Sequence, residues 1–193
     1  MTIRPATTAE LPRVAELHAA RITEGFLTSL GTPFLRRLYR RVARSDGSFI
    51  LVEQLDCDVV GFVAGVANLS ALYRSFLIRD GAVAAAMAAP KVVRAVPRVI
   101  ETLKYPSATG DLPDAEILAV AVAPEHAGRG IGTALVRAAT TEFLRRDITA
   151  AKVVTTADNT AALAMYEAAG YQRTAGLEVH TGRSSEVLVW TAS

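Results

Sequence analysis

Apolar residues recur along the chain at two different spacings, one typical of helices and one typical of strands. They fall three and four residues apart from Leu11 to Ile22 and again after Pro33, which predicts two amphipathic helices. Segments rich in β-branched residues follow over 48–54 and 59–67, and the acidic turn between them predicts a hairpin. The first part of the chain therefore predicts two helices beside an antiparallel pair of strands.

The second half of the chain alternates apolar strand-like segments with periodic helical ones. We expect strands over 116–122, 152–156 and 186–190, and helices over 130–146 and 159–169. A short strand at 3–4 precedes the first helix. Thr7 and Glu10 have the spacing of a capping box, which favours a helix start at that point.

Residues 71–112 interrupt this order and predict an insertion of two or three helices. The stretch 72–104 contains six basic and two acidic residues. The insertion is a candidate lid over a binding pocket or a candidate contact in a homodimer, and a solvated helical face is the alternative. A basic lid would favour a negatively charged ligand.

Composition narrows the class of protein. The chain has 193 residues, 51% hydrophobic and 21% charged, with a formal net charge of +2, which predicts one globular domain over 1–193 and excludes disorder as the main state. The single cysteine, Cys57, excludes an internal disulfide framework. The longest apolar run, 82–89, is far shorter than the ~20 residues of a membrane span. We therefore expect a cytoplasmic protein without a membrane span.

Two kinds of partner have no support in the sequence. The three histidines do not cluster with other ligand types, so we predict no metal site. The basic residues are not interleaved with aromatic ones and the net charge is small, so we predict no nucleic-acid binding.

Three glycines alternate with larger residues before the helix at 130–146. Glycine allows a tight turn and close approach of a ligand, and the first N–H groups of a helix attract anions. The segment therefore predicts a phosphate or pyrophosphate site. The third glycine comes too early for a dinucleotide-binding fingerprint, and no lysine follows it as a P-loop requires. A helix start that merely tolerates glycine is the alternative.

Asn159 and Tyr166 lie seven residues apart, almost two helical turns, and therefore share one helix face with Ala162. Each also has an ordinary structural interpretation. An asparagine at a helix start is commonly an N-cap, and a tyrosine at helical spacing is commonly part of the core.

Taken together, these two segments resemble the GNAT superfamily of N-acetyltransferases. Residues 122–132 are similar to its acetyl-CoA pyrophosphate motif, and residues 159–171 are similar to its second motif. The resemblance covers about 116–173. It implies an α/β fold in layers, with a mixed, largely antiparallel sheet flanked by helices and a helical insertion between the third and fourth strands.

The resemblance also implies the site residues. Acetyl-CoA would lie between the strands at 116–122 and 152–156, and Asn159 would contact its arm. Tyr166 would protonate the departing thiolate. The backbone expected to pair with the pantetheine arm is that of Val120, Ala121 and Val122, and the residues expected around the pyrophosphate are Ala127, Gly128, Arg129, Gly130, Ile131, Gly132 and Thr133. The family usually has Arg or Gln where this chain has Ala127, so one bracketing side chain is missing, and His126 or Arg129 is a candidate substitute.

An amine must lose a proton before it attacks a thioester directly, and Glu116 is the candidate general base. Burial in an apolar strand would raise its pKa toward neutrality, whereas a glutamate in solvent or in an ion pair is the alternative. Glu24 is a second candidate. The sequence thus predicts acetyl transfer to a small-molecule amine or amino sugar in preference to a protein. A non-catalytic acyl-CoA-binding module on the same fold is the alternative.

Overall fold

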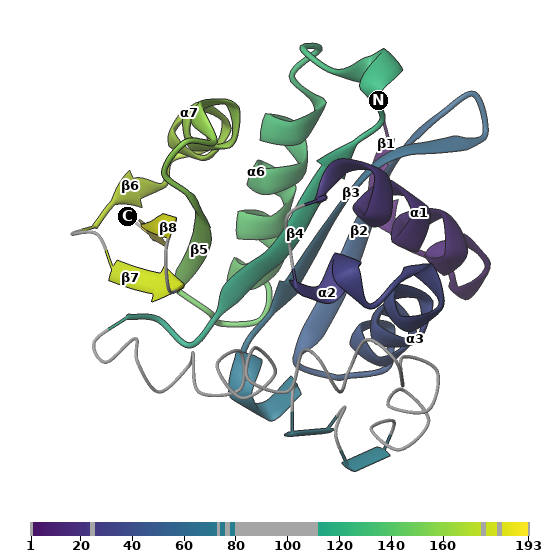
Figure 1. Cartoon of the computed structure of the whole chain (residues 1–193), viewed down its shortest axis with the longest axis horizontal. Helices are drawn as coiled ribbons and strands as arrows, with labels where there is room; N and C mark the ends of the chain where they lie inside the picture. The colour runs from purple at the N-terminus through teal and green to yellow at the C-terminus, as the bar shows by residue number, and fades with distance from the viewer. Residues whose placement is uncertain are drawn as a thin grey trace.

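One mixed β-sheet runs through the described part of the chain (Figure 1). The computed structural model describes residues 2–23, 26–72, 74–75, 78–79, 112–174, 177–180 and 183–192. The strands are β1 (Thr2–Pro5), β2 (Ser48–Leu55), β3 (Asp58–Val66), β4 (Glu116–Val122), β5 (Ala150–Thr156), β6 (Gln172–Arg173), β7 (Leu177–His180) and β8 (Arg183–Thr191). Their order is β1-β2-β3-β4-β5-β8-β6, with β7 paired to β8. Of these pairs only β4 and β5 are parallel, so the largely antiparallel sheet is confirmed.

Helices cover both faces of the sheet. They are α1 (Leu11–Arg21), α2 (Phe26–Ser29), α3 (Thr32–Ala43), α6 (Ile131–Leu144) and α7 (Thr160–Ala168), with short 3-10 turns η1 (Thr8–Glu10) and η2 (Pro124–His126). Helices α1 and α3 pack on one face, and α6 and α7 contribute to the core on the other. The predicted insertion at 71–112 falls largely outside the described residues.

Outside the insertion, the predicted helices and strands are present, and the differences lie at their ends. Strand β5 begins two residues before the strand predicted at 152–156, because it pairs with β8 from Ala150–Thr191 to Thr156–Ser185. Strand β8 extends beyond the strand predicted at 186–190 on both sides, because its first residues also pair with β7. The four-residue helix α2 is too short to leave a periodic pattern. The hairpin turns at Asp56 and Cys57, whose φ angles are 46° and 71°.

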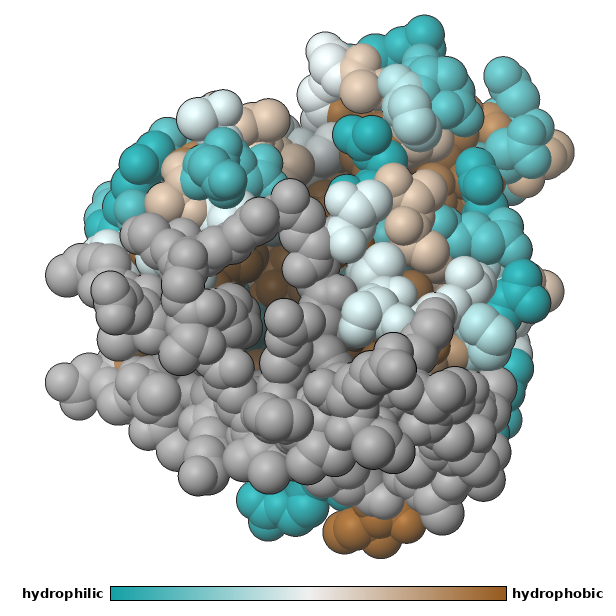
Figure 2. Space-filling view, viewed as in Figure 1, coloured by the Kyte–Doolittle hydropathy of each residue, from teal (hydrophilic) through white to brown (hydrophobic). Residues whose placement is uncertain are grey.

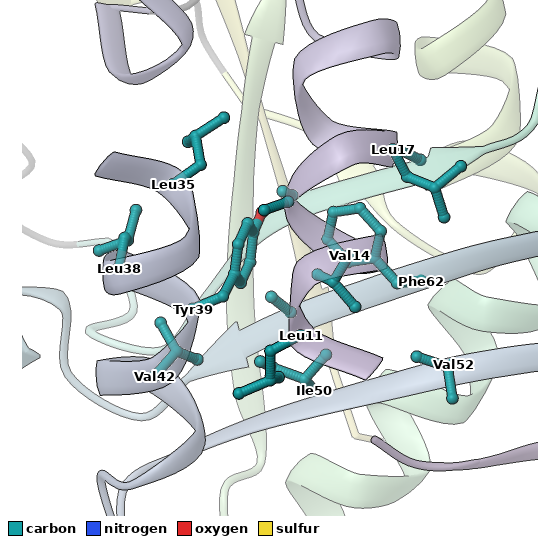
Figure 3. Close-up of a cluster of buried hydrophobic side chains, with 14 of the residues drawn as sticks. Leu11, Val14, Leu17, Leu35, Leu38, Tyr39, Val42, Ile50, Val52 and Phe62 are labelled. Carbon is teal, nitrogen blue, oxygen red and sulfur yellow. The ribbon is translucent and has the colours of Figure 1, made fainter. Parts of the chain in front are cut away.

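The core beneath α1 and α3 is a cluster of apolar side chains that includes the ring of Tyr39 (Figure 3), and it also contains a polar pair, His18 and Tyr39. The Nδ1 atom of His18 lies 2.6 Å from the hydroxyl of Tyr39, and the Tyr39 ring packs edge-on against Phe62. Burial lowers the pKa of His18 to about 4, so the imidazole is neutral at physiological pH. His18 therefore contributes to packing in this core.

A β-bulge in β4 changes which side chains share a face. Ala64 pairs with Ala119, the next residue Gly65 pairs with Ile117, and Leu118 is left without a partner. Simple alternation along the strand predicted that Glu116, Leu118 and Val120 share one face, and for Val120 this is wrong. Leu118 packs against the core of α1 and α3, whereas Val120 packs against that of α6. The extra residue of a bulge shifts the alternation by one position.

Candidate active site

Strands β4 and β5 pair at a single position and then separate. Their register consists of Glu116 opposite Lys152, supported by a 2.8 Å hydrogen bond from the Lys152 N–H to the Ala115 carbonyl. Beyond this pair β4 is bonded to β3 and β5 is bonded to β8. Within the described residues, the facing edges of β4 and β5 therefore lack a strand partner toward their carboxyl ends. Unpaired backbone groups of this kind can bind an extended ligand in strand fashion.

The molecular surface is hollowed at this place. Figure 2 shows the hollow between the part of the molecule that carries α7 and the part that carries β4 and α1, with hydrophobic residues at its bottom. Val120, Ala121 and Val122, predicted to pair with an extended cofactor arm, form the end of β4 next to this separation.

The glycine loop between η2 and α6 has the backbone that an anion site needs. Gly128 and Gly130 have φ angles of 75° and 76°, which only glycine adopts readily, and a Cβ at either position would meet nothing within 4 Å. These glycines therefore keep the chain in a left-handed turn over open space. Gly132 has a different role. A Cβ at this position would lie 2.5 Å from the Met165 sulfur, so a residue without a Cβ lets α6 approach α7.

The N–H groups of this loop are free to bind a ligand. Among the described residues, none of the N–H groups of residues 128–133 donates to a backbone carbonyl. They lie at the N-terminal end of α6, where the helix dipole favours an anion. Ala127 is exposed and offers no bracketing side chain. The half-buried side chain of His126 and the exposed side chain of Arg129 approach each other at 3.5 Å beside it.

Asn159 is the N-cap of α7. Its Oδ1 accepts a 3.1 Å hydrogen bond from the N–H of Ala162, which satisfies one of the free donors of the first turn. The capping interpretation is therefore confirmed. Contact with a cofactor stays a prediction, and it would fall to the amide nitrogen, because the oxygen is used by the cap.

Tyr166 projects from α7 into the core beside Tyr171. The two rings lie 5.9 Å apart and the residues are linked by a 3.0 Å hydrogen bond from the Tyr171 N–H to the Tyr166 carbonyl. Among the described residues, the Tyr171 hydroxyl is buried and has no hydrogen-bond partner. Burial, and then the charge of Glu116, raise the pKa of Tyr166. Tyr166 therefore keeps its proton across the physiological pH range.

Glu116 and Lys152 form a buried pair at the closed end of the β4–β5 separation. Glu116 is 8% exposed and Lys152 is 2% exposed. The Lys152 Nζ lies 3.7 Å from Glu116 Oε2, too far for a hydrogen bond, and Oε2 has no other partner. Burial raises the pKa of Glu116 from 4.5 to about 7, against the opposing effect of the Lys152 charge. A carboxyl with this pKa can take up and release a proton near neutral pH.

The structure brings together some predicted residues and adds others. Tyr166 and Glu116 come close enough for the charge of one to act on the other, while Glu24 lies outside the described residues. Sequence reasoning missed Lys152. Its signal was a lone basic residue at the start of an apolar strand. Within the described residues, no group of three or more potential metal ligands occurs, and no helix is both long and apolar enough to cross a bilayer.

The fold and this site together identify the class of protein. The model of the acetyltransferase (GNAT) family matches residues 12–171, most of the chain. The protein therefore belongs to the acetyltransferase (GNAT) family and is an acyltransferase of that family. A comparison with curated proteins found no significant match.

Solved structures of acetyltransferases share the fold. A ribosomal-protein-alanine N-acetyltransferase from Brucella melitensis matches with a TM-score of 0.65, 17% identity and 99% coverage of both chains. A spermidine N-acetyltransferase mutant from Vibrio cholerae matches with a TM-score of 0.60, 14% identity, and 99% coverage of this chain and 95% of that one. An aminoglycoside acetyltransferase in complex with coenzyme A and kanamycin matches with a TM-score of 0.62 and 17% identity. The match covers 98% of this chain and 94% of that one. At such identities the likeness is one of fold.

Proposed function

We propose that the protein transfers the acetyl group of acetyl-CoA to an amine, with Glu116 as general base and Tyr166 as general acid. The observation that carries this proposal is a pair of groups, Glu116 at the closed end of the β4–β5 separation and Tyr166 on α7, in which the charge of Glu116 raises the pKa of Tyr166. One is a buried carboxyl with a pKa of about 7, and the other is a tyrosine hydroxyl that stays protonated.

The residues present fit acetyl-CoA. The free N–H groups at 128–133 suit its pyrophosphate, and the unpaired edge of Val120–Val122 suits the amide-containing arm. These two features lie at the carboxyl end of one strand, β4, and in the loop that follows it. When bound, acetyl-CoA supplies the thioester whose acetyl group is transferred.

Glu116 removes the proton that keeps the acceptor amine unreactive. The amine nitrogen then bonds to the acetyl carbon, the carbon–sulfur bond breaks, and no protein nucleophile is required. A base with a pKa near 7 is ionised in about half of the molecules at neutral pH, and it still holds a proton well enough to take it from an ammonium group.

Tyr166 provides the proton that the leaving sulfur needs. Its raised pKa keeps the hydroxyl intact but also makes it a weaker acid. The negative charge of Glu116 contributes to that raised pKa, so protonation of Glu116 by the amine removes this contribution. Base and acid are therefore coupled, since Tyr166 becomes more acidic when Glu116 has accepted the proton.

For the acceptor we favour a small-molecule amine or amino sugar. The comparison structures include enzymes named for spermidine and for aminoglycosides, and also one named for a ribosomal protein. The first two enzymes are named for small amines, which supports a small-molecule acceptor. The third is named for a protein acceptor, so the experiment must also include a peptide.

The proposal is tested by thiol release from acetyl-CoA with a polyamine, an aminoglycoside, an amino sugar nucleotide and a peptide with N-terminal alanine. We expect turnover with at least one small amine. Tyr166→Phe should lower kcat by about 100-fold and leave the Kd for acetyl-CoA unchanged, because the ring remains. Tyr171→Phe is the matched control, and it removes only an unpartnered hydroxyl. Tight acetyl-CoA binding with no turnover on any amine would instead indicate a non-catalytic acyl-CoA-binding module.

A further inference from the structure

Lys152 is a buried lysine in the middle of the sheet. It is 2% exposed, and the residue paired with it on the neighbouring strand β8 is the apolar Val189. The Nζ atom donates a hydrogen bond to the Pro113 carbonyl and lies 3.7 Å from Glu116 Oε2. A charged ammonium group in such surroundings is costly unless it is paired, so this position calls for an explanation.

We propose that Lys152 is a positioning residue that favours the ionised form of the Glu116 carboxyl, against the effect of burial, at the closed end of the separation between β4 and β5. The proposal rests on the role of Glu116 in the proposed function, which Lys152 serves without touching the substrate.

The placement of Lys152 follows from the backbone. The parallel ladder between β4 and β5 consists of the Glu116–Lys152 pair alone, so both side chains emerge side by side where the strands still touch. The hydrogen bond to Pro113 holds the ammonium group from the segment that leads into β4. Lys152 therefore has a fixed position, whereas Oε2 of Glu116 has no hydrogen-bond partner and is free to accept a proton.

The other groups around Glu116 cannot replace the charge of Lys152. From the α7 side, Tyr166 and Tyr171 are neutral, because burial raises the pKa of each. From α1, the buried His18 is neutral, because burial lowers its pKa to about 4. Among the described groups near Glu116, Lys152 is thus the buried cation available to stabilise its charge.

The remaining charged groups on the packed elements lie at the surface. On α1 these are Arg13, Glu16 and Arg21, and on β3 it is Asp58, all of them exposed. On α6, Glu142 forms ion pairs with Arg145 and Arg146, and Arg137 donates to the Ala168 carbonyl. Solvent screens such groups, so among the charged groups Lys152 acts most strongly on the carboxylate, although burial has the larger effect on its pKa.

The test compares Lys152→Met with the wild type by the pH dependence of kcat/KM. An opposite charge at this distance lowers a carboxyl pKa by about one unit or more, so its removal should move the acidic limb upward by about that amount. At pH 7 we expect a loss of about fivefold or more, recovered at higher pH. Lys152→Arg should restore the wild-type profile. An unchanged acidic limb in Lys152→Met would overturn the proposal.

A double variant separates the proposed role from a structural one. Lys152→Met in a Glu116→Gln background removes both buried charges, so it should fold even where a single variant does not. If Lys152 acts through Glu116, this second substitution causes no further loss of kcat. An equal loss in both backgrounds would mean that Lys152 supports the fold or the substrate directly, and the proposal would be wrong.

The coupling can also be measured without any turnover. Titration of the Glu116 carboxyl by carbon-13 NMR should show a higher midpoint in Lys152→Met than in the wild type, with no acetyl-CoA or amine present. If the protein acetylates no amine, a shifted midpoint still supports the Lys152–Glu116 coupling while the proposed function fails. An unshifted midpoint contradicts the coupling whatever the activity.

Discussion

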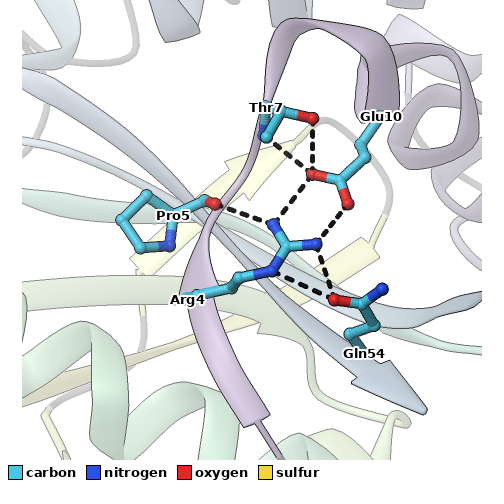
Figure 4. Close-up of polar contacts among 5 residues, drawn as sticks. All are labelled: Arg4, Pro5, Thr7, Glu10 and Gln54. Carbon is cyan, nitrogen blue, oxygen red and sulfur yellow. Dashed lines mark hydrogen bonds and ion pairs between the residues drawn. The ribbon is translucent and has the colours of Figure 1, made fainter. Parts of the chain in front are cut away.

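Two glutamates in this protein each lie beside a basic residue, and their environments act on them in opposite directions. At the N-terminal corner, Glu10 meets Arg4 through two hydrogen bonds of 2.5 and 3.0 Å and also accepts from the N–H and hydroxyl of Thr7 (Figure 4). At the β4–β5 junction, Glu116 meets Lys152 at 3.7 Å without a hydrogen bond. The pKa of Glu10 is lowered to about 2, chiefly by Arg4, and that of Glu116 is raised to about 7, chiefly by burial.

The difference shows that a nearby cation does not by itself keep a carboxylate charged. Hydrogen bonds to its oxygens favour the charged form, whereas removal of water disfavours it. Glu10 has several donors and some solvent. Glu116 has a distant ammonium group and is almost fully buried. The first arrangement stabilises a corner of the fold, and the second produces a carboxyl that titrates near neutral pH, as the proposed general base requires.

The largest expected effect is the loss of kcat when Glu116, the proposed base of the Glu116–Lys152 pair, is replaced. Glu116→Gln removes the base, and we expect kcat to fall by about 100- to 10,000-fold, with little change in acetyl-CoA affinity. The loss should be greatest above pH 7, where the wild-type carboxyl is ionised, and should shrink below it. Steady-state kinetics over a pH series measures this. If the single variant folds poorly because Lys152 is left unpaired, Glu116→Gln with Lys152→Met provides the same comparison.

The next effect is on the pH dependence of stability, and it has opposite signs at the two sites. The pKa of Glu116 is higher in the folded state, so stability falls as pH rises from 4.5 to about 7, by on the order of 2–3 kcal/mol. The pKa of Glu10 is lower in the folded state, so its contribution is present above pH 4.5 and is lost as pH falls toward about 2. Urea unfolding at a series of pH values, with each glutamate changed to glutamine, should remove one slope at a time. Two slopes of the same sign would contradict the comparison.

The smallest effect is expected from Glu10→Gln at neutral pH. Glu10 is partly solvated, so its loss should cost only about 1 kcal/mol of unfolding free energy, and kcat should stay unchanged. Thermal unfolding and the thiol-release assay measure the two quantities. A large loss of activity would show that this corner communicates with the site, contrary to the view that it serves the fold alone.

Local patterns were sufficient for part of the site. The glycine loop, the capping Asn159 and the helical position of Tyr166 all depend on residues within a few positions of one another, and periodicity shows them. Glu116 was also visible, because a single charged residue in an apolar strand stands out. For the same reason, most helices and strands were predicted with errors only at their ends.

The relation between distant segments was not available from these patterns. Lys152 is 36 positions from Glu116, and their pairing depends on the parallel ladder between β4 and β5. The bulge at Leu118 depends on the register with β3, so simple alternation placed Val120 on the wrong face. The enclosed hydroxyl of Tyr171 likewise results from packing against α7 rather than from any local signal.

The sequence by itself determined the elements and the glycine loop, because backbone conformation and helix periodicity are properties of short segments. A single charge in an apolar strand indicated the candidate base, and the resemblance to the GNAT family indicated the candidate acid. Only the tertiary structure decided how far each charged group is separated from water and which partner it meets. Exposure to water and the identity of the partner set the pKa of a carboxyl. For this reason the pKa values of two glutamates, Glu10 and Glu116, differ by several units in the folded protein.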